Sequence, residues 1–167
     1  MIQLFTELQE KKNVRSNLSA LRASLKEATE EQKAQAIEFV RGHEDLVFGF
    51  LQEEDAKTRK NAALLLGDLA VQNALQPLWK AYTREQTLFV KSAYLEAMKA
   101  LHAEEILSQL KDRLAELEGE PVTEENRKHW EAELRALRAI LIQYEGIDTH
   151  HFDIKQKKKR FGFDILN

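Results

Sequence analysis

The chain carries, in its middle, the stretch DAKTRKNAALLLGDLAVQNALQPLW, from Asp55 to Trp79. A second stretch, QTLFVKSAYLEAMKALHAEEILSQL from Gln86 to Leu110, aligns with it at a constant shift of 31 residues. A repeat of about 30 to 47 residues is typical of helical hairpins, which bury their apolar faces by stacking on one another. The repeat therefore predicts an all-α chain, an α-solenoid of about three to four hairpins.

The composition favours helices over other structures. The 167 residues include only 6 Gly and 2 Pro, which is few for a β-rich fold with many turns. With 43% hydrophobic and 32% charged residues the chain is too apolar to be disordered. There is no Cys, which excludes disulfides and thiolate chemistry. The first residues resemble neither a signal peptide nor a membrane span, so we expect a cytoplasmic protein that binds no membrane.

Helix signals recur on both sides of the repeat. Thr29 and Gln32 form a capping-box pattern that predicts a helix ending near Gly42. The apolar segment LVFGFL, from Leu46 to Leu51, is interpreted as the buried second helix of a first hairpin. Apolar stripes predict an earlier helix and the third hairpin. Their members are Val14, Leu18, Leu21 and Leu25, then Phe89, Ala93, Ala97 and Leu101, then Ile106, Leu110, Leu114 and Leu117.

The second hairpin and the last helix have clear starts. Asp55 is expected to cap an almost entirely apolar helix that includes Ala62 to Ala70. Pro77, which removes an internal hydrogen bond, predicts either a kink or a helix that starts close to it. Thr123 is expected to cap a final helix that buries Trp130 and ends at Gly146.

The pattern D-x-x-T-R-x-x-A-x-x-x-L-G-x-L resembles the first helix of a HEAT repeat. Its members here are Asp55, Thr58, Arg59, Ala62, Leu66, Gly67 and Leu69. The hairpins from about Thr29 to Gly146 are similar to a short HEAT or armadillo-type array. The resemblance implies a right-handed stack in which the second helix of each hairpin lines a concave side, where partners commonly bind. The motif is a packing motif and implies no catalytic residue.

These observations predict a non-catalytic scaffold that binds a protein partner, without a cofactor, a metal ion or a small-molecule substrate. The expected contact residues lie on the second helices, where aromatic and Arg side chains suit a binding hot spot. They are Gln76, Trp79, Lys80, Arg84 and Lys111. Trp79 has two interpretations, a seam residue between hairpins or an exposed anchor on the concave side.

The last residues depart from the helical pattern. We divide the chain into a helical repeat domain, 1–146, and a basic, aromatic tail or junction to a further domain, 147–167. Apolar residues alternate in the tail on both sides of a cationic run, which consists of Lys155, Lys157, Lys158, Lys159 and Arg160. Three readings stay open: an extended tail packed on the last hairpin, a strand that docks on a partner or joins another domain, and a phosphate-binding segment.

The alternatives to a protein-binding scaffold involve nucleic acid or a metal ion. Outside the tail run there are 20 basic and 28 acidic residues, so the body carries no obvious excess of positive charge for binding phosphates. A local basic strip on one face stays open, formed by Lys57, Arg59, Lys60, Lys80, Arg84 and Lys91. A nucleic-acid-binding module, or an accessory domain of a larger nucleic-acid-modifying enzyme, remains the alternative function. His43 and Glu44 resemble one His-Glu pair of a HEAT-like metal hydroxylase, which needs several such pairs. Residues nominated for a HEAT-like DNA glycosylase are Trp79, Trp130, Asp68 and Asp112.

Overall fold

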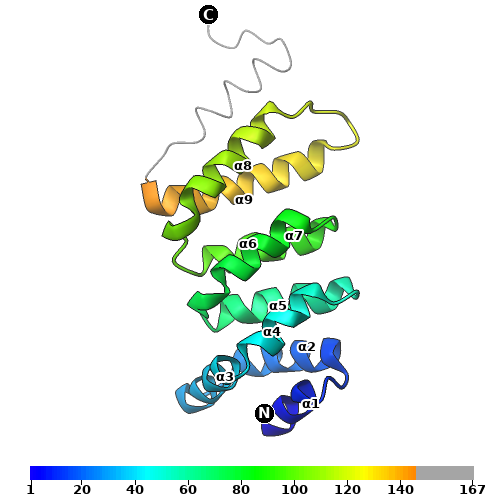
Figure 1. Cartoon of the computed structure of the whole chain (residues 1–167), viewed down its shortest axis with the longest axis vertical. Helices are drawn as coiled ribbons and strands as arrows, with labels where there is room; N and C mark the ends of the chain where they lie inside the picture. Colours follow the sequence, from blue (N-terminus) through cyan, green and yellow to red (C-terminus); the bar gives the residue numbers. More distant parts are fainter. Residues whose placement is uncertain (146–167) are drawn as a thin grey trace, which may run out of the picture. The chain divides into compact units, whose positions relative to one another are not determined.

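The computed structural model describes residues 1–145, and the regular structure in this range is helical throughout, as the sequence predicts (Figure 1). The first helices are α1 (Ile2–Gln9), α2 (Val14–Leu25), α3 (Glu30–Gly42), α4 (Glu44–Gly49) and α5 (Ala56–Asp68). They are followed by α6 (Leu75–Arg84), α7 (Leu88–Lys99), α8 (Leu107–Gly119) and α9 (Arg127–Glu145). Short 3-10 helices are η1 (Phe50–Gln52), η2 (Gln72–Ala74) and η3 (Glu104–Ile106).

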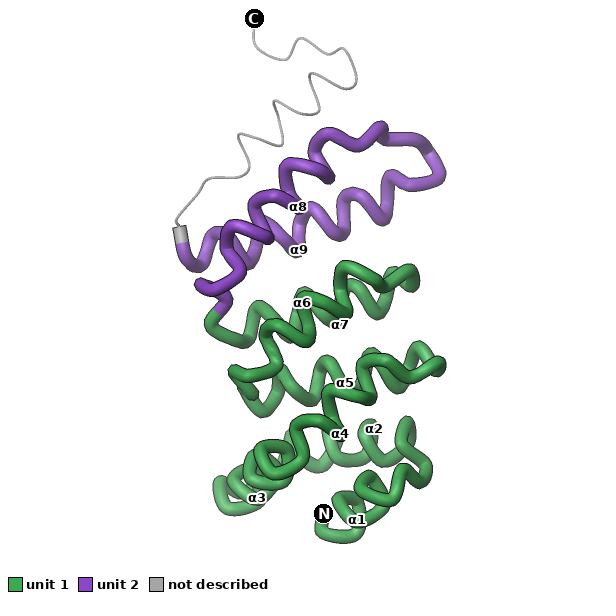
Figure 2. Tube along the Cα trace, viewed as in Figure 1, with its two compact units in different colours: residues 1–102 green, residues 103–167 purple. Residues whose placement is uncertain are grey.

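The chain divides into two compact units, Met1–His102 and a second unit that begins at Ala103 (Figure 2). The domain division at residue 146 stays a prediction. Its tail, 147–167, and the expected helix stop at Gly146 lie outside the described residues.

In the first unit, α5 lies between α2 and α7 and packs against both. Residues 62–67 of α5 are all buried, because each side of this helix meets a neighbour. At Gly67 the two helices come close together, since a Cβ atom there would lie 2.9 Å from the Cα atom of Ala97 on α7. The all-round apolar pattern of this stretch is thus explained by two helix contacts.

Two ion pairs show that α2 and α5 run in the same direction. Arg15 and Asp55, at the starts of the two helices, are 3.6 Å apart, and Arg22 and Asp68, near their ends, are 2.8 Å apart. The N-terminal turns of both helices therefore lie at one end of this unit.

The expected helix caps at Thr29 and Asp55 are confirmed, whereas α9 begins at Arg127 and Thr123 accepts from the Asn126 amide in the turn before it. The Thr29 side chain accepts from the Gln32 amide while the Gln32 side chain accepts from the Thr29 amide. The Asp55 carboxylate accepts from both the amide and the hydroxyl of Thr58. Pro77 sits in the first turn of α6, where a backbone N–H has no partner within the helix, so α6 starts close to Pro77.

Two predicted segments differ from expectation in detail. The segment Leu46 to Leu51 is helical, but it begins within α4 and changes to the 3-10 helix η1 at Phe50. Phe89 is 47% exposed, so its assignment to the buried stripe of the third hairpin is wrong. Val90, fully buried, faces the core in its place, because the register of α7 turns the side chain before it outward.

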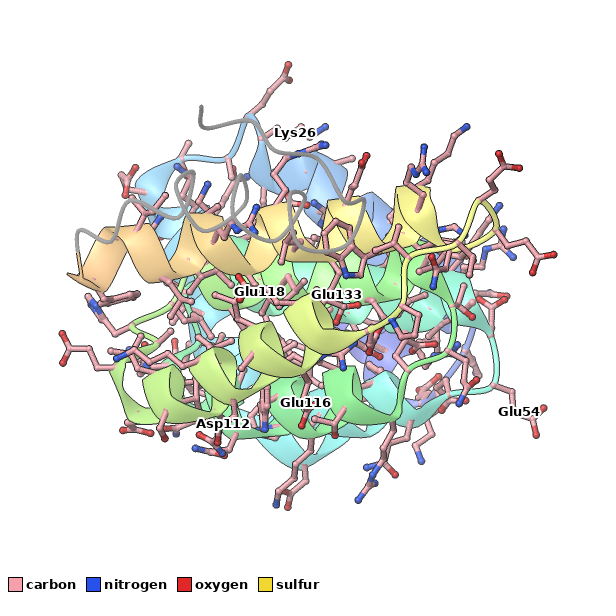
Figure 3. The ribbon with its side chains drawn as sticks, turned by 90° about the horizontal axis from the view of Figure 1, so that it is seen from above. Lys26, Glu54, Asp112, Glu116, Glu118 and Glu133 are labelled. Atoms are coloured by element: carbon pink, nitrogen blue, oxygen red, sulfur yellow. The ribbon has the colours of Figure 1, made fainter. Side chains whose placement is uncertain are left out.

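The second unit contains α8 and α9, which pack on each other as an antiparallel hairpin. Trp130 is buried, as predicted, and its indole N–H donates to the Leu117 carbonyl near the connecting loop (2.6 Å). At the other end, the Ala103 amide donates to the Tyr144 hydroxyl (2.9 Å). Glu118 and Glu133 lie between the two helices in Figure 3, and Arg113 on α8 binds Glu133 at 2.9 Å.

Across residues 1–145, the helices are too short or too polar to cross a membrane.

Replacing Gly67 with Ala is expected to destabilise the protein by about 1–3 kcal/mol, as overpacking of a close-packed core does. The added methyl group would overlap the backbone of Ala97, so α5 and α7 would have to separate. Urea unfolding followed by circular dichroism measures this change. A free energy of unfolding equal to that of the wild type would contradict the close approach.

Replacing Ala70 with Gly is the matched change, and it is expected to stabilise the protein by about 0.5–1 kcal/mol. Ala70 follows α5 with a left-handed φ of 50°. The Ala70 amide donates to the Gly67 carbonyl, and the Val71 amide donates to the Leu66 carbonyl. These two hydrogen bonds form a Schellman motif at the end of the helix. Glycine adopts this conformation without steric cost, so the same urea experiment should show opposite signs for the two substitutions.

Candidate partner-binding groove on α6

A groove of about 670 Å³ lies in the first unit between α6 and the segment formed by the end of α4, η1 and the residues that follow. On the α6 wall, Pro77, Lys80, Ala81 and Arg84 share one face, because they are spaced by three, four and seven residues. The opposite wall is formed by Phe48, Leu51, Gln52, Glu53 and Glu54. Arg59, Tyr94 and the loop 85–87 complete the lining. We call this site the α6 groove.

Arg59 on α5 organises one end of the α6 groove. Its guanidinium binds both carboxylate oxygens of Glu85, each at 2.9 Å. Its remaining terminal nitrogen donates to the Glu53 and Glu54 carbonyls, each at 2.8 Å. One side chain of the core helix thus holds both walls of the α6 groove, with a bidentate geometry that Lys would not reproduce.

Glu85 receives two further hydrogen bonds. The Tyr94 hydroxyl, on α7, donates to Glu85 Oε1 at 3.2 Å and lies 3.4 Å from the Leu51 carbonyl. The Thr87 amide donates to Glu85 Oε2 at 3.1 Å. The Glu85 side chain is only 5% exposed, so these bonds replace the water that the carboxylate loses on burial.

The local charges set the protonation states of this network. Burial by itself would raise the pKa of Glu85, but the hydrogen bonds from Arg59 and the Thr87 amide outweigh it, so its pKa lies below the ordinary value. Burial and the neighbouring Glu85 carboxylate raise the pKa of Tyr94 well above its usual value. Glu85 is therefore ionised and Tyr94 neutral at physiological pH, which favours the observed ion pair.

The rim of the α6 groove carries opposite charges on its two walls. Lys80 and Arg84 are exposed on α6, and Glu53 and Glu54 are exposed on the other wall. Among residues 1–145, neither Lys80 nor Arg84 forms an ion pair. Between these charged edges, Phe48, Leu51, Pro77 and Ala81 supply apolar surface. This arrangement suits a polypeptide segment, because apolar contact and rim charges combine at protein interfaces.

The predicted contact residues fall into different places. Lys80 and Arg84 line the α6 groove. Gln76 is exposed and does not line the groove. Trp79 is partly buried, with its ring centroid 5.4 Å from that of Tyr82, so it matches neither a fully buried seam residue nor a fully exposed anchor. Lys111 is on α8 in the second unit. The tail cations Lys155, Lys157, Lys158, Lys159 and Arg160 lie outside the described residues.

The sequence predicts Lys80 and Arg84 as contact residues but not the network at the other end of the groove. From the sequence, Arg59 is a member of the packing motif and of the local basic strip, and no pattern singles out Glu85, Tyr94 or the Glu53–Glu54 carbonyls. The one available signal was that Arg59 and Glu85 are both charged residues next to apolar helices. Their pairing across 26 positions needed the tertiary structure.

His43 and Asp68, two of the residues weighed for a metal or glycosylase site, have structural partners. His43 Nδ1 lies 2.8 Å from the Phe39 carbonyl and Nε2 lies 2.6 Å from the Gln9 amide, while the ring stacks on Phe39. Asp68 is paired with Arg22. In the described range, no three His, Asp or Glu side chains converge as metal ligands would.

No family model matches the chain, and comparison with the curated proteins and with the solved structures finds no match either.

Replacing Glu85 with Gln is expected to destabilise the protein by about 1–3 kcal/mol at pH 7, because Arg59 loses a charged partner. The loss should shrink at low pH. Since the folded-state pKa of Glu85 is depressed, its contribution is complete above the unfolded-state value of about 4.3 and disappears as the pH falls through the folded-state pKa. Urea unfolding at pH 7 and pH 3 tests this, and an equal loss at both values would contradict the ionic role.

Replacing Tyr94 with Phe is a second test of the same network. It removes one hydroxyl that donates to Glu85 Oε1, so we expect a loss of about 1 kcal/mol at pH 7. The pKa of Tyr94 is raised, so the hydroxyl itself stays protonated between pH 3 and pH 7. Because its hydrogen bond helps to lower the pKa of Glu85, the loss should also shrink at pH 3, and an equal loss at both pH values would contradict this coupling.

Proposed function

We propose that the protein is a non-catalytic scaffold that binds a segment of a protein partner in the α6 groove. The observation that carries this proposal is the groove itself, with its apolar floor, rim cations that form no ion pair within residues 1–145, and the Arg59–Glu85 support beneath it. Arg59 and Glu85 hold the walls before any partner arrives, and a preorganised site loses less conformational entropy on binding. The proposed partner carries an apolar side chain for the floor and carboxylates for Lys80 and Arg84.

We further propose that the hairpins form a short HEAT-like α-solenoid. The support comes from the first unit, where α2, α5 and α7 pack in succession and α6 packs on α7. Gly67 and Arg59, both members of the HEAT-like pattern, occupy places where packing and charge require those residue types. In such an array α6 is the second helix of its hairpin, on the side where partners commonly bind. The tail is proposed as a second contact with the partner.

The double variant Lys80→Glu and Arg84→Glu is expected to reduce partner capture about tenfold, because charge reversal replaces attraction with repulsion at the rim. The chain of residues 1–167 serves as bait in an extract of its source cells, and bound proteins are quantified by mass spectrometry. Photo-crosslinking from position 81, on the floor of the α6 groove, identifies which captured protein contacts it.

Two controls make the test specific to the groove. Lys57→Glu with Lys60→Glu changes the net charge by the same amount at another surface and should leave capture unchanged. Gln76→Ala alters an exposed residue of α6 outside the lining, so we expect a small effect. Equal capture by the wild type and the Lys80/Arg84 variant, with a folded circular dichroism spectrum, would reject the groove as the binding site.

A further inference from the structure

A second hollow, of about 620 Å³, lies in the first unit between the N-terminal turns of α2 and α5. We call it the basic hollow. Its lining includes three cations but no carboxylate, and the other members are small or neutral polar residues apart from one valine. These residues are Asn13, Val14, Arg15, Ser16, Ser19, Lys57, Lys60 and Asn61. None of them lines the α6 groove.

The cations of the basic hollow are largely uncompensated. Among residues 1–145, Lys57 and Lys60 form no ion pair. Arg15 lies 3.6 Å from Asp55 Oδ1, too far for a short hydrogen bond, and both groups are about half exposed. The other oxygen of Asp55 already accepts two hydrogen bonds from Thr58. Asp55 also interacts electrostatically with Lys57. One carboxylate neutralises three cations only in part, so the hollow keeps a net positive charge.

The parallel packing of α2 and α5 brings these charges together. Arg15 comes from one helix, and Lys57 and Lys60 come from the other, one helical turn apart. Two neutral donors, the Ser19 hydroxyl and the Asn61 side-chain amide, line the same hollow. Neither makes a side-chain hydrogen bond within the described residues, so both are available to a ligand. The Ser16 hydroxyl is already bound to the Asn13 carbonyl at 3.1 Å.

This donor set matches a phosphate group. Phosphate oxygens accept several charge-assisted hydrogen bonds at once, and Arg supplies a planar pair of donors while Lys supplies point charges. We propose that the basic hollow binds a phosphate group, either of a small phosphorylated ligand or of a nucleic-acid strand. The site shares no residue with the α6 groove, and the proposal stands whether or not the proposed scaffold function is correct.

Amide NMR spectra of the ¹⁵N-labelled full chain test the proposal and localise the binding. One titration uses inorganic pyrophosphate and a second uses an oligothymidylate, each at low salt. Shifts concentrated at residues 13–19 and 57–61 with either probe are expected. Shifts with pyrophosphate indicate that the phosphate group is sufficient, whereas shifts with the oligonucleotide alone indicate a strand. For a strand, three phosphate contacts predict a fall in log K of about 2 per tenfold rise in salt.

Lys57→Glu with Lys60→Glu should weaken this binding at least about tenfold. The Lys80→Glu and Arg84→Glu variant, with the same change of net charge, should leave it within about twofold of the wild type. The proposal is overturned if neither probe shifts residues 13–19 and 57–61, if the shifts are confined to the tail, or if the Lys57/Lys60 variant binds as well as the wild type.

Discussion

The burial of α5 between α2 and α7 is the constraint on which the first unit depends. A helix enclosed in this way must be apolar on nearly every side, and it must offer a small residue where a neighbour comes closest. Gly67 meets the second requirement against Ala97. Since α2 and α7 both rest on α5, the positions of the outer helices follow from these contacts.

Arg59 connects this core to the surface. It lies near the start of α5, and it binds groups from two loops that are separated by more than thirty residues. The pair with Glu85 is largely buried, so its value depends on complete hydrogen bonding rather than on charge alone. Tyr94 and the Thr87 amide complete that bonding. The α6 groove is therefore shaped by the same residues that stabilise the helix packing.

The two surfaces of the first unit differ in chemistry. The α6 groove combines apolar floor residues with opposite charges on its rims, which favours a polypeptide. The basic hollow has three cations and few apolar atoms, which favours an anion with several oxygen acceptors. The net charge of the chain, −3, conceals this difference because it sums over the whole sequence. Where cations gather in space decides what each surface can bind.

Sequence patterns alone were sufficient for the helical class, the capped starts at Thr29 and Asp55, and the burial of Trp130. These features depend on periodicity and on bonds within a few residues, which a sequence displays directly. The tertiary structure decided the outward turn of Phe89, the Arg59–Glu85 pair, and the gathering of Arg15, Lys57 and Lys60. Each of these depends on which helix faces are brought together over long separations, and no local spacing records that choice.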